Sequence, residues 1–288
     1  MGFGAKKIIV RELNENTGRN GDLFARWWIP ENVLGCVVIV HGLGEHGGRY
    51  EGIAQRLGGA GWATLVADLR GHGRSPGRRG HASRYVDWLQ DIEAMRLTAA
   101  ERFPHVPQVL LGHSMGGNLA TNYVLRRTEL HKPLPPPVGL VLSGPMFLPF
   151  NPPTRPQIFA AWATGYVVPW LTIRAPVDTS KLSRNPETVN ELRSDPLCHN
   201  RLSVYLGTQL LAQGRYALDH AKELTVPTLL MHGEDDPITS FRATESFAIR
   251  AGDVATFVNF PKMLHEIFNE TEAEVVFQTL VHWLERFK

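Results

Sequence analysis

The sequence has little cysteine, no block of like charges and no long apolar run, and each shortage excludes a class of protein. Two cysteines in 288 residues, Cys36 and Cys198, supply neither a disulfide framework nor the repeated spacing of a metal site. The 30 basic and 28 acidic residues are mixed along the chain, which argues against nucleic acid as a partner. Residues 1–20 lack the apolar core of a signal peptide, so we expect a globular protein of the reducing cytoplasm.

The chain does contain short apolar runs that alternate with helix-like stretches. From Cys36 onward most runs are continuous, which is typical of strands covered on both faces of a parallel sheet. The first two runs alternate with polar residues and flank a polar turn, 14–21, which predicts an antiparallel hairpin at the sheet edge. The predicted strands are Lys7–Glu12, Leu23–Ile29, Cys36–Val40, Ala63–Ala67, Gln108–Leu111, Gly139–Leu142, Thr228–Met231 and Thr256–Phe260. The predicted helices are Tyr50–Ala60, Ser83–Arg102, Met115–Arg127, Phe241–Ile249 and Ala273–Phe287.

The alternation stops between Pro145 and Leu224, where a proline cluster precedes helical patterns. We interpret this segment as a helical cap inserted over the C-terminal ends of the strands, where open α/β sheets bind ligands. Ordinary surface helices are the alternative. The interpretation divides the chain into a first core part, 1–144, a cap, 145–224, and a second core part, 225–288.

An apolar stripe at roughly helical spacing lies within the cap, in the longest apolar stretch of the chain, 158–171. This stretch is short for a bilayer-spanning helix and contains Pro169, which predicts a buried or interfacial helix. Three roles compete: a wall of an acyl tunnel, a transient contact with a membrane surface, and packing of the cap against the core. If the stripe binds substrate, Phe159, Trp162 and Tyr166 are the candidate residues.

One short motif indicates a catalytic serine. The sequence Gly-His-Ser-Met-Gly at 112–116 follows an apolar run and opens a helix-like stretch, which is the setting of a nucleophile elbow. On such a turn the hydroxyl of Ser114 is exposed to substrate. The pattern alone is weak evidence, because roughly one chain in ten of this length carries it by chance. The alternative is a helix-capping serine between glycines, so the rest of the chain must decide.

A serine nucleophile needs a base within hydrogen-bonding reach, most often a histidine. Of the 12 histidines, His265 follows the last predicted strand on a short loop, which places it at the same sheet edge as Ser114. The acid that orients it should follow the preceding strand, where Glu234, Asp235 and Asp236 compete. Their alternative role is that of turn residues before Pro237.

Acyl transfer also needs an oxyanion hole. One donor should be the N–H of Met115, the residue after the nucleophile, and the second should come from a loop after an earlier strand. The loop that begins at His41 fits, with the N–H of Leu43 as the second donor.

The same loop matches a different motif. Residues 42–47 read Gly-x-Gly-x-x-Gly after a strand, and Asp68 ends the next strand, which together form a dinucleotide-binding fingerprint. Against a nucleotide site, Gly48 and Arg49 predict a flexible loop where the motif requires a helix. We therefore keep a dinucleotide-binding oxidoreductase only as a remote alternative.

Five blocks in this order extend along nearly the whole chain: the glycine-rich loop, an Asp-Leu-Arg-Gly-His-Gly turn, the elbow, a His-Gly-Glu-Asp-Asp turn and a His-Glu pair. They are His41–Tyr50, Asp68–Ser75, Gly112–Gly117, His232–Asp236 and His265–Glu266. With these residues the chain resembles the monoacylglycerol lipase and lysophospholipase branch of the α/β-hydrolase superfamily. The Asp-Pro-Leu stretch at 195–197 is also similar to this family.

The resemblance implies an α/β-hydrolase fold, with a mostly parallel eight-stranded sheet, helices on both faces and an inserted helical cap. It implies that Asp236, three residues after the glycine of its block, is the acid, and that Asp68, His72 and His113 are structural. The expected activity is a serine ester hydrolase that uses Ser114, His265 and Asp236, acts on a small lipid-like ester and requires no metal or other cofactor. A peptidase of the same fold, a cofactor-free haloperoxidase and a C–C bond hydrolase remain alternatives, since each can use the same three residues. A non-catalytic binding module would lack one of them.

Overall fold

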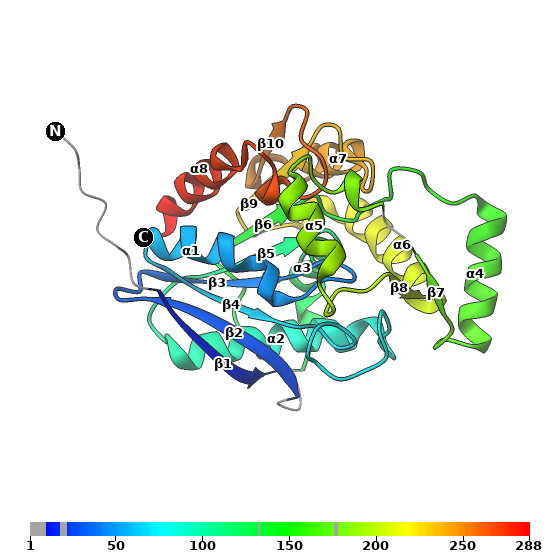
Figure 1. Ribbon diagram of the computed structural model, residues 1–288, viewed down its shortest axis with the longest axis horizontal. Helices are drawn as coiled ribbons and strands as arrows, with labels where there is room; N and C mark the ends of the chain where they lie inside the picture. Colours follow the sequence, from blue (N-terminus) through cyan, green and yellow to red (C-terminus); the bar gives the residue numbers. More distant parts are fainter. Residues whose placement is uncertain (1–9, 18–21, 132, 176–177) are drawn as a thin grey trace.

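An eight-stranded, mostly parallel sheet forms the centre of the protein (Figure 1). The computed structural model describes residues 10–17, 22–131, 133–175 and 178–288. The strands lie in the order β1-β2-β4-β3-β5-β6-β9-β10; β1 and β2 pair antiparallel, as do β2 and β4, and the other neighbours are parallel. This confirms the predicted fold class and the edge hairpin. The bounds are β1 (Val10–Thr17), β2 (Leu23–Pro30), β3 (Gly35–Val40), β4 (Trp62–Ala67), β5 (Gln108–His113), β6 (Gly139–Ser143), β9 (Thr228–Gly233) and β10 (Ala255–Phe260).

Helices cover both faces of the sheet (Figure 1). Alternate residues of β3 point to opposite faces: Val37 and Ile39 belong to one apolar cluster, and Val38 and Val40 to the other. Because both faces are buried, the strand reads as a continuous apolar run. On the Val37 face lie α1 (Glu51–Gly59) and α8 (Ala273–Leu284); on the Val38 face lie α2 (Tyr85–Arg102), α3 (Met115–Leu125) and α7 (Phe241–Ala251).

Short 3₁₀ turns extend or follow several of these elements. They are η1 (Gly47–Tyr50), η2 (Arg127–Glu129), η3 (Thr179–Lys181), η4 (Ala221–Glu223), η5 (Gly252–Val254), η6 (Ile267–Asn269) and η7 (Glu285–Phe287). The turn η1 leads directly into α1, so the expected flexible loop at Gly48 and Arg49 is wrong.

The first strand differs from its prediction. It continues to Thr17, into the segment predicted as a turn, whereas residues 7–9 of the prediction lie outside the described part of the chain. The polar side chains here have partners on one side of the strand: Glu15 accepts from Trp27 Nε1 on β2 and pairs with Arg102 of α2. A polar stretch on an edge strand therefore resembled a loop in the sequence.

Three α-helices, two short strands and the turns η3 and η4 lie between β6 and β9, in the predicted insertion, and Figure 1 shows α4, β7, β8 and α6 beyond one end of the sheet. Within it α6 packs against α3 and α7, and α4 packs against α6. Two short antiparallel strands were not predicted there. The cap remains a proposed division of the chain. Its elements are α4 (Arg155–Val167), β7 (Thr172–Arg174), α5 (Pro186–Ser194), β8 (Arg201–Ser203) and α6 (Val204–Asp219). Among the described helices, none combines the length and apolar character needed to cross a bilayer.

The strand order reverses at β3, and this reversal positions the site. From β3 the chain first adds β4 on one side and then returns to add β5 on the other. The carboxyl ends of β3 and β5 therefore flank a crevice at a topological switch point, where open α/β sheets bind ligands.

Candidate active site

Ser114 lies on a strained turn between β5 and α3. It has φ 52° and ψ −116°, and apart from Lys262 it is the only non-glycine residue with positive φ in the described part of the chain. Neighbouring glycines permit the turn, because a Cβ at Gly112 would lie 2.4 Å from Gly116 O and one at Gly116 would lie 1.9 Å from Val40 O. The observed strand, turn and helix are the context that the elbow motif requires.

His265 and Asp236 form a buried pair beyond the ends of β10 and β9. The Nδ1 of His265 lies 2.7 Å from Oδ2 of Asp236. Because the carboxylate only accepts, Nδ1 carries the proton and Nε2 is the ring atom left to act as a base. Glu234 and Asp235, the two competing acids, are exposed, whereas Asp236 is buried.

The pKa values of this pair move apart. Burial lowers the pKa of His265, but the Asp236 carboxylate outweighs burial and raises it above its usual value. Burial raises the pKa of Asp236, but His265 and His232 hold it well below its usual value. Asp236 is thus an anion at neutral pH and stabilises the charged form of the imidazole.

A cavity of about 530 Å³ opens onto Ser114 and His265. Leu43 and Met115, the two predicted oxyanion donors, also line it. Met115 is the first residue of α3, where a helix leaves its N–H groups without intrahelical acceptors. The structure therefore brings together Ser114, His265 and the two candidate donors around one volume.

The loop that carries Leu43 is held by its own buried side chains. His41 bonds Gly42 O through Nδ1, 2.8 Å away, and accepts from Leu69 N at Nε2, 2.9 Å away. Because a carbonyl only accepts and an amide N–H only donates, His41 is fixed as the Nδ1–H tautomer. Its ring links the loop after β3 to the loop after β4.

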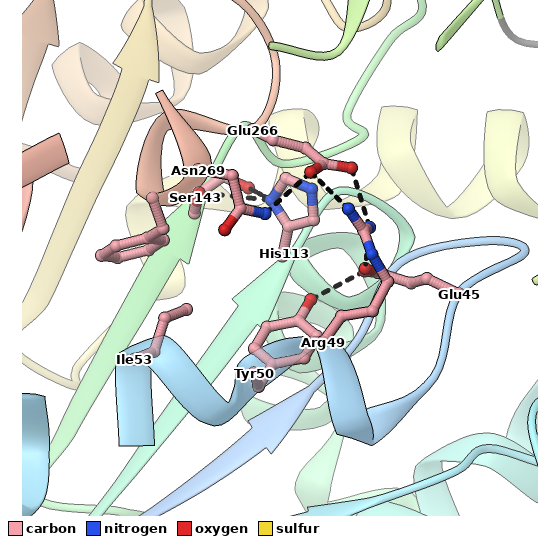
Figure 2. Close-up of a pocket in the computed structure, with 9 residues that line it drawn as sticks. Glu45, Arg49, Tyr50, Ile53, His113, Ser143, Glu266 and Asn269 are labelled. Carbon is pink, nitrogen blue, oxygen red and sulfur yellow. Dashed lines mark hydrogen bonds and ion pairs between the residues drawn. The ribbon is translucent and has the colours of Figure 1, made fainter. Parts of the chain in front are cut away.

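A buried ionic network contacts this loop (Figure 2). Glu45 accepts from Gly42 N and from the Tyr50 hydroxyl. Arg49 joins Glu45, at 2.8 Å, to Glu266, at 2.7 Å, and Glu266 directly follows His265. The network therefore connects the loop after β3, which carries Leu43, with the loop that carries His265.

These charges are stable because they are paired. Burial would raise the pKa of Glu45, but Arg49 and its other partners lower it to about 2. Glu45, Arg49 and Glu266 were not predicted as functional residues; the signal in the sequence was an acid and a base at i and i+4, Glu45 and Arg49.

His113 lies against the same network (Figure 2) and also lines the cavity, and its structural role stays a prediction. Its Nδ1 donates to Ser143 O, and its ring centroid lies 4.8 Å from that of His265. Burial, with a smaller contribution from the nearby His265, lowers the pKa of His113 to about 4, so His113 is neutral at physiological pH.

Both carboxylate oxygens of Asp68 accept hydrogen bonds from neighbouring protein groups, which argues against the dinucleotide alternative. Its Oδ1 accepts from Arg26 and from Gly47 N, and its Oδ2 from Arg74 N, at 2.8–3.0 Å. A carboxylate so occupied does not offer its oxygens to a ribose. His72 is likewise buried, with a pKa well below its usual value because of burial and the neighbouring His41.

The segment 195–199, in the proposed cap, contacts the loop after β3. Asp195 Oδ2 lies 2.7 Å from His46 Nε2, and His199 N donates to Gly44 O over 2.8 Å. A Cβ at Gly44 would lie 2.1 Å from His199 O, so glycine permits this approach. Cap and loop are therefore joined directly beside the cavity.

The His46 and Asp195 side chains lie close to Cys198, in a cluster with metal-ligand atoms. Gly48 N donates to His46 Nδ1, so His46 Nε2 carries the proton and donates to Asp195. A metal ion at Nε2 would need that lone pair free, so the residues present fit a hydrogen-bonded link better than a metal site.

The predicted substrate-binding aromatic residues of α4 do not line the cavity. Phe159, Trp162 and Tyr166 are exposed, Tyr166 by 81%, and their rings stack along the helix with centroids 6.1 Å apart. Within α4 only Gly165 is buried, where the helix meets Tyr205 of α6. In this structure the three side chains face solvent and neither line the cavity nor pack against the core, and their role in substrate binding stays a prediction.

Comparisons with known proteins agree with this geometry. The profile of the family described as serine aminopeptidase, S33, matches residues 31–272. The chain is 31% identical over 260 residues to a monoacylglycerol lipase of Mycolicibacterium smegmatis, covering 89% of this chain and 90% of that protein. It is 32% identical over 265 residues to an abhydrolase domain-containing protein of Dictyostelium discoideum, covering 91% of this chain but only 27% of that longer protein. A crystal structure of Paleococcus ferrophilus monoacylglycerol lipase superposes with a TM-score of 0.79 at 29% identity, covering 97% of this chain and all of that one.

Proposed function

The chain belongs to the serine aminopeptidase S33 family of α/β hydrolases, and from this premise we propose that it is a serine hydrolase of lipid-like carboxylic monoesters. Monoacylglycerol lipase-like relatives support a carboxylic ester hydrolase. The observation that carries the proposal is the bond between Asp236 and His265, on a cavity that also holds the strained Ser114.

In the proposed reaction, Ser114 Oγ attacks the ester carbonyl carbon while His265 Nε2 takes its proton. Asp236 holds the ring and stabilises its charged form. The N–H groups of Leu43 and Met115 bind the oxyanion, and donors of this kind each contribute about 3–4 kcal/mol. His265 then returns the proton to the leaving alcohol, which leaves an acyl-enzyme on Ser114.

Water completes the cycle. His265 takes a proton from the water that attacks the acyl carbon, and returns it to Ser114 Oγ as the carboxylic acid leaves. Every step uses residues of this chain, and the scheme routes no step through a metal or other cofactor.

The lining of the cavity supports a substrate with an acyl chain. Besides the reacting groups it carries several apolar side chains, together with polar and charged ones such as Arg193 and Asp195. Apolar walls with a few convergent polar groups are typical of sites for small lipid-like molecules. The apolar lining residues include Met146, Leu182, Leu192, Leu202, Leu210 and Ile238.

We also propose that α4 makes a transient contact with membrane surfaces. Its exposed aromatic row continues through Val167, Trp170 and Leu171, all of them exposed. Arg155 and Arg174, at the two ends of this segment, are exposed cations that would face anionic head groups. An apolar row of this kind beside a lipid-ester site favours substrate uptake from an interface.

The decisive test is the loss of ester hydrolysis in Ser114→Ala. With p-nitrophenyl butyrate we expect kcat/KM to fall by at least about a thousandfold, because no other group replaces the nucleophile. Thermal unfolding should stay within about 1 °C of wild type. Activity above a tenth of wild type would exclude Ser114 as the nucleophile.

The substrate class is tested with the wild-type protein. We expect turnover of p-nitrophenyl esters and monoacylglycerols of increasing chain length to exceed that of an aminoacyl anilide. Faster cleavage of the anilide would favour the peptidase alternative. Absence of ester turnover would favour a haloperoxidase or a C–C bond hydrolase.

A further inference from the structure

The carboxylate of Asp236 serves two imidazole rings at one oxygen. Its Oδ2 lies 2.7 Å from His265 Nδ1 and 2.9 Å from His232 Nε2, and it accepts from Thr239 Oγ1 over 2.7 Å. Its Oδ1 accepts from the backbone N–H groups of Ile238 and Thr239. Every direction around the carboxylate is therefore used by a fixed donor.

His232 has no access to substrate. It lies on β9 with no exposed surface and is absent from the lining of the cavity. Its Nδ1 lies 2.9 Å from Thr244 Oγ1 on α7, and its ring meets Phe241 edge to face. Nε2 donates to Asp236, and Nδ1 forms the bond with the Thr244 hydroxyl, so both ring nitrogens have partners.

We propose that His232 is a positioning residue for the reaction: it fixes Oδ2 of Asp236 and shares the charge of this oxygen with His265, and thereby sets the basicity of His265. The inference rests on the proposed function, in which His265 is the base. A carboxylate oxygen that accepts from two rings gives each ring less stabilisation than it would give one ring alone.

Removing the bond from His232 should therefore raise the pKa of His265. The other ionisable groups that face His265 are unchanged by this substitution, so they do not mask the effect. They are His113 from β5, Glu266 beside it in the chain, and Glu45 from the loop after β3, with Arg49 joined to both acids.

The test compares His232→Leu, which removes the donor, with His232→Gln, whose amide retains one. In protein with ¹⁵N-labelled histidine, the pKa of His265 is read by NMR titration, a measurement that needs no substrate. We expect His232→Leu to raise this pKa by about half a unit and His232→Gln to restore most of the wild-type value. His282→Gln is the matched control, because the side chain of His282 is 88% exposed.

A kinetic measurement accompanies the titration. With p-nitrophenyl butyrate, His232→Leu should lower kcat, measured per titrated active site, about tenfold, while KM stays within twofold of wild type. The acidic limb of the pH–rate profile of this variant should move to higher pH. A merely structural role would instead reduce the fraction of active protein and leave the limb in place. Thr244→Val, which keeps the volume but removes the bond to His232 Nδ1, should shift the pKa in the same direction by less.

An unchanged or lowered pKa of His265 in both His232→Leu and Thr244→Val would overturn the inference. If His232→Leu does not fold, the pKa of His265 in Thr244→Val alone decides: a raised pKa supports the inference, and an unchanged or lowered pKa overturns it. A failure of the proposed function looks different, because ester turnover would then be absent from the wild-type protein or would survive in Ser114→Ala.

Discussion

Ser114 holds a backbone conformation that its side chain disfavours. At φ 52° and ψ −116° a Cβ is crowded, and such positions cost on the order of 1–3 kcal/mol. The surrounding bonds enforce the turn, because Ser114 N donates to Ser143 O and Met146 N donates to Ser114 O. Stability is therefore lost at the residue that the proposed chemistry uses.

Glycine at this position should release the strain. We expect Ser114→Gly to unfold about 2 °C above Ser114→Ala, since relief of strain exceeds the extra entropy of glycine in the unfolded chain by about 1 kcal/mol. Both variants should lack esterase activity, and differential scanning calorimetry compares them. A Ser114→Gly protein less stable than Ser114→Ala would mean that the turn is unstrained.

Single residues were predicted where a short motif or a fixed spacing exists. Ser114 follows from the elbow motif and His265 from its loop after the last strand, whereas Asp236 needed the family resemblance to separate it from Asp235. His232 was quoted as part of a block but given no role. Its importance depends on a contact between the end of β9, α7 and the Asp236 turn, which no spacing in the sequence expresses.

At the scale of elements, α4 is the part of the molecule whose setting differs most from ordinary globular packing. Figure 1 shows it at the margin of the protein, joined to the body through α6. Its aromatic side chains face solvent although each would gain free energy by leaving water. Exposed apolar rows of this kind mark interaction surfaces.

The proposed membrane contact is tested with the double variant Trp162→Ser/Tyr166→Ser. We expect its co-sedimentation with vesicles of phosphatidylcholine and anionic phosphatidylglycerol to weaken roughly thirtyfold, because the two missing rings together forfeit on the order of 2 kcal/mol of apolar transfer. Turnover of dissolved p-nitrophenyl butyrate should be unchanged. Ile249→Ser on α7 is the matched control, since Ile249 is equally exposed but distant in sequence from the cap. Equal losses in the two proteins would contradict the proposal.

Elements were predictable where both sides of a strand are covered. Strands β3 to β6 read as continuous apolar runs because helices bury both faces, and their positions were predicted to within two residues. β1 was mispredicted because the partners of its polar side chains come from β2 and α2, distant in sequence. The apolar stripe on α4 was visible in the sequence, but its exposure to solvent was not predictable. Periodicity shows which face of a helix is apolar and does not show whether another element covers that face.

At the scale of the whole molecule, several buried histidines are held neutral. Burial is the largest cause that lowers the pKa of His41, His72 and His113, the last to about 4. In the unfolded chain these rings titrate near 6.5. Between the two values the unfolded state binds more protons, so the free energy of unfolding decreases as the pH falls.

Acidification from pH 6.5 to 5 should therefore destabilise the fold. The pKa of about 4 for His113 alone corresponds to a loss of about 3 kcal/mol over the full range from 6.5 to 4. His265, whose pKa is raised, contributes stability that is fully present below pH 6.5 and therefore does not oppose the trend. Glu45, with a pKa of about 2, loses its contribution only as the pH falls below its unfolded value near 4.5.

Urea unfolding at pH 6.5 and pH 5 measures this effect. The midpoint should fall at the lower pH with an unchanged m-value, and His113→Gln should weaken the dependence. A midpoint independent of pH in this window would mean that the histidines titrate normally in the folded state.

The unequal burial of the tryptophans gives the cap an optical label. Of seven tryptophans, Trp27, Trp28, Trp62, Trp88 and Trp283 are at most 3% exposed, whereas Trp162 and Trp170 are 57% and 53% exposed. The red-shifted, quencher-accessible part of the intrinsic fluorescence thus arises from the tip of the cap, and the blue-shifted part arises from the body of the protein. Contact of the cap with another surface can be followed by emission alone, without an added dye and separately from unfolding.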